Sequence, residues 1–181
     1  MTASRTAAFI DGPRLLLREV RLTDVTDAYH RWMNDPEVTR YLETRFVPQS
    51  RDKIAAYVTA MDQSTDSVFL AIVVKEDDHH IGNIKLGPID WVHQRADIAL
   101  VIGDKAAWGR GYASEAIGLL TEYAFRTLRL HKVTAGCYAT NVGSAKAFLK
   151  AGFTREGARR QQYVSDGGYV DEILLGRVRS A

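Results

Sequence analysis

Features that mark specialised classes of protein are scarce in this sequence of 181 residues. It has a single cysteine, Cys137, so it can form neither an internal disulfide nor a cysteine-based zinc site, and we expect a small strand residue there. Its longest apolar run, Val68–Val74, is far shorter than the roughly 20 residues that cross a bilayer. Its first residues lack the apolar core of a signal peptide. We therefore expect a cytoplasmic protein with no membrane partner.

An excess of charge of one sign is also missing. The 24 Lys and Arg residues nearly balance the 22 Asp and Glu residues, and a net charge of +2 is too small for the broad positive field of most nucleic-acid-binding proteins. We expect no nucleic-acid partner. The adjacent His79 and His80 would point to opposite faces of a strand, so we predict no metal site. Because linkers and repeats are absent, the sequence predicts one domain over residues 1–181, with its core at about 12–178.

What is present is a regular alternation of strand and helix patterns. Apolar runs predict about seven strands, and apolar residues at helical spacing predict about four helices, two of them beginning after Thr23 and Ser50. Residues 34–49 are expected to be irregular, Gly87-Pro88 to form a turn, and Gly152 to end the last helix in the left-handed conformation. The predicted fold class is α+β, with one mixed, mostly antiparallel sheet. The predicted strands are residues 14–20, 68–75, 81–86, 96–102, 132–138, 154–163 and 169–178, and the predicted helices are residues 25–32, 54–61, 113–128 and 142–149.

Two glycines, Gly109 and Gly111, lie between a predicted strand and a predicted helix. Glycines let backbone N–H groups turn toward one point, and the helix adds its unpaired N-terminal donors, so the segment suits a phosphate. The nucleotide-triphosphate pattern GxxxxGK[ST] is absent, and the following strand has no acidic residue for a dinucleotide ribose. Nucleotide-triphosphate binding and dinucleotide binding are therefore both disfavoured. A tight strand-to-helix turn without a ligand remains the alternative for this pair of glycines.

Two linked motifs carry a resemblance to a known family. The segment Trp108-Gly-Arg-Gly-Tyr-Ala-Ser-Glu-Ala116, followed by Asn141-x-x-Ser144-x-x-x-Phe148-x-Lys150-x-Gly152-Phe153, resembles the GNAT N-acetyltransferases, most of all their ribosomal-protein N-terminal (Rim-type) branch. The order of predicted strands and helices is also that of the family. The resemblance implies an acyltransferase with a GNAT-like fold and acetyl-CoA as cosubstrate.

The resemblance also implies where acetyl-CoA binds. Its pantetheine arm would run along Leu100, Val101 and Ile102, where the strands ending at Ile102 and Tyr138 splay apart. Asn141 would lie beside this arm, although it is also a good helix N-cap. The pyrophosphate would bind the backbone amides of Gly109, Arg110, Gly111, Tyr112 and Ala113, and the sulfur would lie near Ser144 and Phe148.

The sequence departs from the family pattern at two positions. Ala106 stands where the loop often begins with Arg or Gln, so side-chain charge for the phosphates must come from Arg110 or elsewhere. Phe148 stands where many relatives carry the tyrosine that protonates the departing thiolate, and phenylalanine has no proton to give. Ser144, one helical turn earlier, becomes the candidate acid. We place the general base at Asp97, with His93 as the second candidate and a solvated strand-edge acid as the plain alternative.

The acceptor of the acetyl group is predicted to be a primary amine. The resemblance implies a pocket built by residues 34–49, the strand near Asp97, Tyr138 and Tyr163. Arg40, Arg45 and Phe46 would suit an acceptor with phosphate and a flat base, such as a nucleotide-linked amino sugar. The alternatives are a protein N-terminus as acceptor, a non-catalytic acyl-CoA-binding module, and a nucleic-acid adaptor, while assembly into a homodimer is left open.

Overall fold

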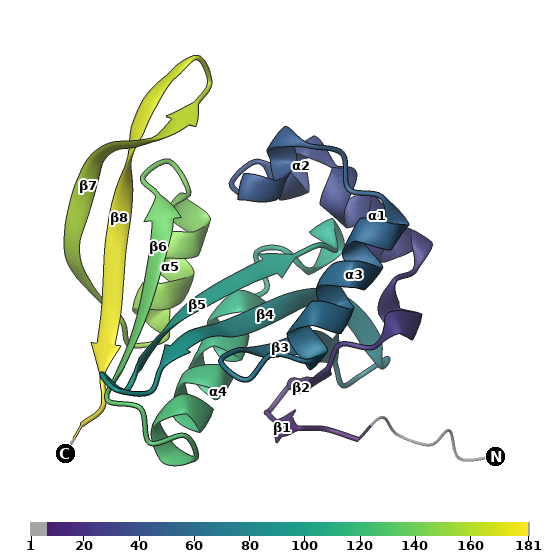
Figure 1. Ribbon diagram of the computed structural model, residues 1–181, viewed down its shortest axis with the longest axis horizontal. Coiled ribbons are helices and arrows are strands. Elements are labelled where there is room, and N and C mark those ends of the chain that lie inside the picture. Colours follow the sequence, from purple (N-terminus) through teal and green to yellow (C-terminus); the bar gives the residue numbers. More distant parts are fainter. Residues whose placement is uncertain (1–6, 181) are drawn as a thin grey trace.

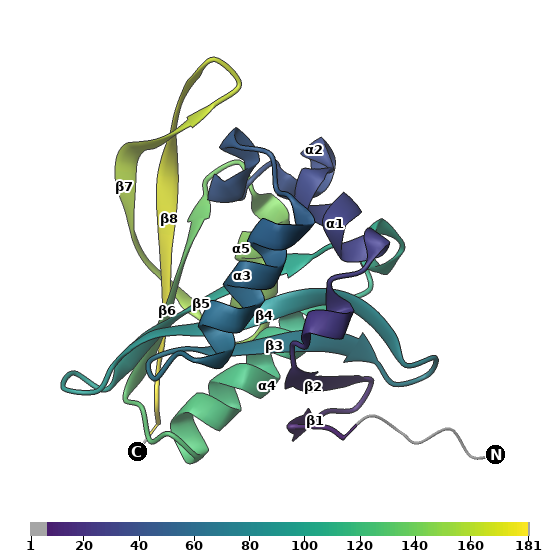
Figure 2. The same ribbon diagram turned by 45° about the vertical axis from the view of Figure 1, so that its right-hand side comes forward.

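The computed structural model describes residues 7–180, which form one eight-stranded sheet with helices on both faces (Figures 1 and 2). The strand order is β1-β2-β3-β4-β5-β6-β8-β7, and only β5 and β6 run parallel. This confirms the α+β class and the mixed, mostly antiparallel sheet. The strands are β1 (Ile10–Asp11), β2 (Leu15–Glu19), β3 (Val68–Val74), β4 (His79–Asp90), β5 (Arg95–Ile102), β6 (Lys132–Tyr138), β7 (Thr154–Ser165) and β8 (Gly168–Val178).

The helices divide between the two faces of the sheet. Helix α4 (Tyr112–Arg126) lies behind the strands in Figure 1, and α3 (Arg51–Asp62) lies in front of β3 and β4. On the same side as α3, the helices α1 (Asp27–Asn34) and α2 (Pro36–Thr39) and a 3₁₀ turn, η2 (Glu43–Phe46), cross the upper end of the front face. Helix α5 (Val142–Lys150) packs beside β6. None of the helices within residues 7–180 has the length and apolar character needed to cross a bilayer.

The alternation of side chains along β3 explains the two separate cores. Leu70, Ile72 and Val74 join the main core, which also contains Ile117 and Leu120 of α4. The intervening Ala71 and Val73 join a smaller core formed with residues of α1 and α3. Because successive side chains of a strand point to opposite faces, one continuous apolar run supplies both. Val68–Val74 is the longest apolar run in the sequence because both faces of β3 are covered.

Several predicted boundaries are confirmed by the capping contacts. Ser50 accepts a hydrogen bond from the Lys53 amide at the start of α3, and Asn141 accepts one from the Ser144 amide at the start of α5. Gly152 follows α5 with a φ of +87°, the left-handed conformation expected at this position. Local sequence therefore specifies where these helices begin and end.

Three expectations about the elements were wrong. Thr23 does not cap α1, because residues 22–24 form a 3₁₀ turn and Thr26 makes the capping bond. Residues 34–49 are not irregular throughout, since Asp35 caps α2 and η2 follows. Gly87-Pro88 does not separate two strands: β4 passes through it with a shift of register and continues to Asp90. The eighth strand is the two-residue β1, which is too short to show a pattern in the sequence.

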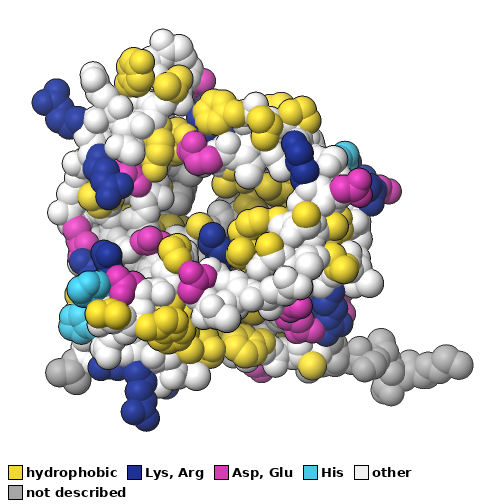
Figure 3. Space-filling model, viewed as in Figure 1, with side chains coloured by type: hydrophobic (Ala, Val, Ile, Leu, Met, Phe, Trp, Pro, Cys, Tyr) yellow, Lys and Arg dark blue, Asp and Glu magenta, His cyan; other side chains and the backbone are white. Residues whose placement is uncertain are grey.

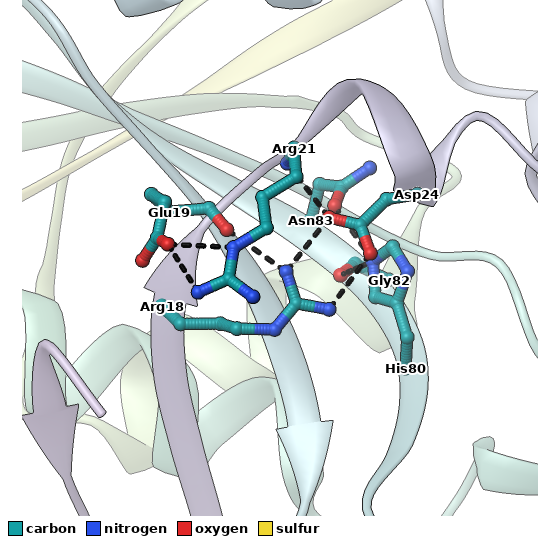
Figure 4. A network of polar contacts seen from close by, with 7 residues as sticks. All are labelled: Arg18, Glu19, Arg21, Asp24, His80, Gly82 and Asn83. Carbon is teal, nitrogen blue, oxygen red and sulfur yellow. Dashed lines mark hydrogen bonds and ion pairs between the residues drawn. The ribbon is translucent and has the colours of Figure 1, made fainter. Parts of the chain in front are cut away.

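A network of charged side chains ties β2 to the turn before α1 (Figure 4). The buried guanidinium of Arg18 donates to both carboxylate oxygens of Asp24, at 2.7 and 2.8 Å, and Asp24 also accepts from the backbone amide of Arg21. Nearby, His80 of β4 contacts the carbonyl oxygen of Gly82, and Trp32 of α1 lies edge-on to its ring. The cost of burying the Arg18 and Asp24 charges is offset by their pairing, so the network fixes the start of the segment that crosses the front face.

Candidate active site

The parallel pair β5–β6 is the main irregularity of the sheet. Pairing covers only Arg95–Asp97 with Lys132–Thr134, and beyond these residues the two strands diverge. Strand β5 continues along β4, whereas β6 continues along β8 in the arm formed by β6, β8 and β7. Figure 3 shows a hollow at this place, between the arm and the region of α1 and α2, with several acidic side chains around its rim. The divergence that the resemblance implied is thus present.

The side of β5 that borders the gap carries the residues expected along the pantetheine arm. Leu100 and Ile102 pack against the main core on the α4 side. Val101 lies between them and points to the opposite face, because side chains alternate along a strand. The strand thus leaves its backbone, rather than a row of large side chains, beside the gap.

The loop after β5 has the backbone conformation expected for a phosphate site. Gly109 and Gly111 have φ values of +73° and +79°, a region that favours glycine. Gly111 is the N-cap of α4 and has no side chain to cap it, so the first-turn N–H groups face no capping oxygen. The indole N–H of Trp108 donates to the carbonyl oxygen of Ile102 at 2.8 Å and holds the loop to the end of β5. An anion such as the phosphates of acetyl-CoA fits this end of the helix.

Helix α5, which follows β6, carries three of the predicted residues at or after its N-cap. Asn141 is its N-cap. The hydroxyl of Ser144, the third residue of α5, interacts with the Cys137 thiol of β6. Burial, and then the negative charge of Glu172, raise the pKa of the Cys137 thiol, so the thiol stays neutral at neutral pH. Phe148 is buried in the main core, edge-on to the ring of Phe153.

Asp97 lies where the gap closes. Its exposed carboxylate accepts a hydrogen bond from the hydroxyl of Thr134, the residue that it faces across the β5–β6 pair. Both side chains line a surface depression, whose other lining residues are Pro88, Ile89, Asp90, Arg95 and Ala96. His93, the second candidate base, lies in the exposed turn between β4 and β5, where its backbone amide donates to Asp90. Asp97 therefore is the better placed of the two.

The predicted acceptor residues come together at the open end of the gap. The rings of Tyr138 and Tyr163 stack with centroids 4.0 Å apart and an interplanar angle of 11°. The guanidinium of Arg45 donates to the Tyr138 hydroxyl and to the carbonyl oxygen of Val164, both at 2.9 Å. Phe46 is exposed, and the Arg45 guanidinium lies 4.2 Å from its ring centroid. Residues 43–46 thus join the ends of β6 and β7.

Two carboxylates at this end were not found by sequence reasoning. Glu43 accepts the Tyr138 hydroxyl at 2.6 Å, and the buried Glu172 accepts the Tyr163 hydroxyl and the Arg159 guanidinium, both at 2.9 Å. Burial, and then the hydrogen bond to Glu172, raise the pKa of Tyr163 well above its ordinary value. Glu172 lies on an apolar strand, and only the pairing of β6 with β8 brings it to the gap. No local signal in the sequence shows this.

A glycine on β6 makes room for the Glu172 side chain. A Cβ atom at Gly136 would lie 2.1 Å from Oε1 of Glu172. Tyr138 faces Glu172 across the β6–β8 pair, so the carboxylate extends diagonally over the β6 backbone. Asp97, Glu172 and Glu43 therefore follow one another along the front face of the gap, with the two stacked tyrosines between the last two.

Comparisons with known proteins agree with this architecture. A family model described as an acetyltransferase (GNAT) domain matches residues 14–154. The uncharacterized N-acetyltransferase p20 of Bacillus licheniformis is 34% identical over 169 residues, which cover 92% of this chain and 93% of that protein. The spermidine N(1)-acetyltransferase of Escherichia coli is 30% identical over 103 residues, or 57% of this chain and 55% of that protein.

A solved structure supports the fold. The spermidine N-acetyltransferase from Vibrio cholerae, in complex with CoA and spermine, superposes with a TM-score of 0.81 at 21% identity, covering 91% of this chain and 95% of that chain. The narrower assignment to the Rim-type branch stays a prediction. Taken with the splayed strands and the glycine loop, these matches show that the chain belongs to the GNAT family of acetyltransferases and is an acyltransferase that uses acetyl-CoA.

Proposed function

We propose that the protein transfers the acetyl group of acetyl-CoA to a primary amine of an aliphatic acceptor that carries a further positive charge, such as a diamine or polyamine. The observation that carries this proposal is the row of carboxylates, Asp97, Glu172 and Glu43, along the front face of the gap. Carboxylates and tyrosine ring faces are the groups that bind alkylammonium ions. The similarity to spermidine acetyltransferases supports the same class of acceptor.

The contacts of Arg45 argue against a nucleotide-linked amino sugar. Its guanidinium is already bonded to the Tyr138 hydroxyl and to the carbonyl oxygens of Leu42 and Val164. A phosphate would have to replace these bonds and approach Glu43 on the same hydroxyl. Because a like charge close by costs binding energy, an anionic acceptor is the weaker candidate. A protein N-terminus, which has one positive charge on a peptide backbone, remains the second candidate.

The reaction needs few groups from the protein. The nitrogen of the neutral amine attacks the thioester carbonyl, the carbon–sulfur bond breaks, and the products are the N-acetylated amine and CoA. One proton leaves the amine nitrogen, for which Asp97 is the proposed base, and one proton must reach the thiolate, for which Ser144 is the proposed donor. Glu172 and Glu43 would bind the ammonium group that does not react, and so place the reacting amine.

A thiol-release assay with acetyl-CoA tests the proposal. The acceptors would be spermidine, 1,4-diaminobutane, 1-aminobutane, a UDP-linked amino sugar and a peptide with a free N-terminus. We expect kcat/KM for the diamine to exceed that for the monoamine of equal length by about 5- to 30-fold, since one added ion pair at a partly buried site contributes about 1–2 kcal/mol. Faster turnover of the sugar nucleotide or the peptide than of any diamine would overturn the proposal.

Charge-neutral variants locate the effect. Glu43→Gln and Glu172→Gln should each reduce the preference for the diamine over the monoamine, because they remove the charge and keep the shape. Glu76→Gln changes an exposed acid in the turn between β3 and β4 and is the matched control, with no expected change in preference. An equal loss for both amines in the two test variants would contradict the assigned role of these carboxylates.

A further inference from the structure

Ala106 stands where the family's loop often begins with Arg or Gln, so charge that balances the phosphates of acetyl-CoA must come from other side chains. In the structure, Ala106 lies in the 3₁₀ turn η3 (Lys105–Ala107), where its amide donates to Asp104. The nearest atoms to a Cβ built on Gly111 belong to two cations from distant elements. Arg14 Nη2 lies 3.6 Å from that point, and Lys150 Nζ lies 3.9 Å from it. Two positive charges thus converge on the glycine that begins α4.

Arg14 is held in place by the helix that follows the loop. Its Nε donates to Oε2 of Glu115 at 2.7 Å, its Nη1 donates to the carbonyl oxygen of Arg110 at 3.0 Å, and its guanidinium lies 4.8 Å from the ring centroid of Tyr112. Oε1 of Glu115 accepts the backbone amides of Arg14 and Leu15. These bonds give Glu115 a structural role. They orient the guanidinium so that Nη2 is the donor nearest Gly111.

Lys150 reaches the same place from the end of α5. Within residues 7–180, its ammonium group takes part in no hydrogen bond and no ion pair, and the side chain is exposed. An unpaired ammonium beside a guanidinium and an uncapped helix N-terminus is unfavourable unless an anion joins them. The three features therefore make one site for a phosphate group.

We propose that Arg14 and Lys150 form a cationic pair that binds a phosphate of acetyl-CoA beside Gly111 and supplies the charge that Ala106 lacks. Arg14 is the better ordered of the two, because Glu115, Arg110 and Tyr112 fix its guanidinium. Lys150 adds a second charge from the C-terminal end of α5. This proposal depends on acetyl-CoA as donor and is independent of the identity of the acceptor, so its failure leaves the proposed acceptor class untouched.

Isothermal titration calorimetry with CoA and with dephospho-CoA tests the pair without turnover. We expect Arg14→Gln and Lys150→Gln each to raise the Kd for CoA by about tenfold, because each variant loses one charge-assisted contact. The difference in Kd between each variant and the unaltered protein should shrink at high salt. Lys146→Gln, an exposed lysine one turn earlier on α5, should leave the Kd unchanged. If the variants bind dephospho-CoA as tightly as the unaltered protein does, the 3′-phosphate is the group that the pair binds. If they bind it more weakly, the pair binds the pyrophosphate.

A separate variant distinguishes direct binding from support of the loop. Glu115→Gln weakens the hold on Arg14 but keeps both cations, so it should change the Kd less than Arg14→Gln does. Arg14→Lys should restore part of the affinity. Thermal melting without ligand would show whether each variant is folded. Unchanged Kd values in both Arg14→Gln and Lys150→Gln, or an equal loss in Glu115→Gln and Arg14→Gln, would overturn the proposal.

Discussion

Replacing Gly136 by alanine would displace the Glu172 carboxylate without removing it. The new Cβ would lie 2.1 Å from Oε1 and 3.1 Å from Cδ of Glu172, so the carboxyl group must move. The clash involves the far end of a flexible side chain, and the β6 backbone need not shift. The substitution therefore tests the position of a charge in the gap, where Glu172→Gln tests its presence.

The cost to stability follows from the bonds that Glu172 would lose. Its hydrogen bond with the Tyr163 hydroxyl is partly buried, and a hydrogen bond to a charged group contributes about 1.5–3 kcal/mol. Its ion pair with Arg159, whose side chain is 60% exposed, contributes about 1 kcal/mol or less. We expect a loss of about 1–3 kcal/mol in the free energy of unfolding, which an ordinary domain survives.

The functional effect should appear in the acceptor and not in the donor. We expect the KM for a diamine to rise about 5- to 30-fold, equivalent to about 1–2 kcal/mol, while the Kd for acetyl-CoA is unchanged. Steady-state kinetics and calorimetry measure the two quantities. Gly157→Ala on β7 is the matched control, because a Cβ there has no atom within 4 Å. An unchanged KM in a folded Gly136→Ala variant would refute the assignment of Glu172 to the acceptor site.

Three further predictions address catalysis and stability. Ser144→Ala should lower kcat, by up to about 10²–10⁴-fold if the hydroxyl is the acid, with little change in the Kd for acetyl-CoA. Asp97→Asn should lose most activity at low pH and recover it at high pH. Full kcat in both variants at every pH would exclude both roles. Gly118→Ala, inside α4 with no atom within 4 Å of the new Cβ, should stabilise the protein by about 0.5–1 kcal/mol in chemical denaturation, and a lower midpoint would contradict this. Burial holds the pKa of His80 below its ordinary value, so as the pH falls the imidazole is protonated in the unfolded chain before it is protonated in the folded protein. The free energy of unfolding should therefore fall as the pH drops below about 6.5, by up to about 1.4 kcal/mol per pH unit. His80→Gln should flatten this slope in denaturation curves, and the exposed His93→Gln should not.

The order of the elements could be predicted because it depends on local patterns. Apolar periodicity, the capping residues Ser50 and Asn141, and the glycine loop each act over a few residues, and the structure confirms them. Residues 34–49 could not be predicted in the same way. Their second turn, η2, is held by bonds from Arg45 to Val164 and Tyr138, which lie far away in the sequence.

The chemistry of the site divides along the same line. The phosphate loop is one continuous segment, so its motif is visible in the sequence. The carboxylates of the proposed acceptor site are not visible in this way, because Glu172 reaches the gap only through the β6–β8 register and the space over Gly136. Arg14 likewise meets the loop only because β2 lies beside α4. Long-range pairing, which a single sequence does not encode locally, supplies most of the charges of the site.

The short parallel pairing of β5 and β6 also has a consequence for motion. Beyond Asp97 and Thr134, each strand has a free edge in the middle of the sheet, a position that proteins normally confine to the outside. The sheet is therefore two antiparallel halves joined by three residue pairs. A ligand with amide groups that pair with these edges would complete the sheet, slow hydrogen exchange of the amides at residues 98–102 and restrict rotation of one half against the other. A donor that paired in this way would join the two halves into one continuous sheet.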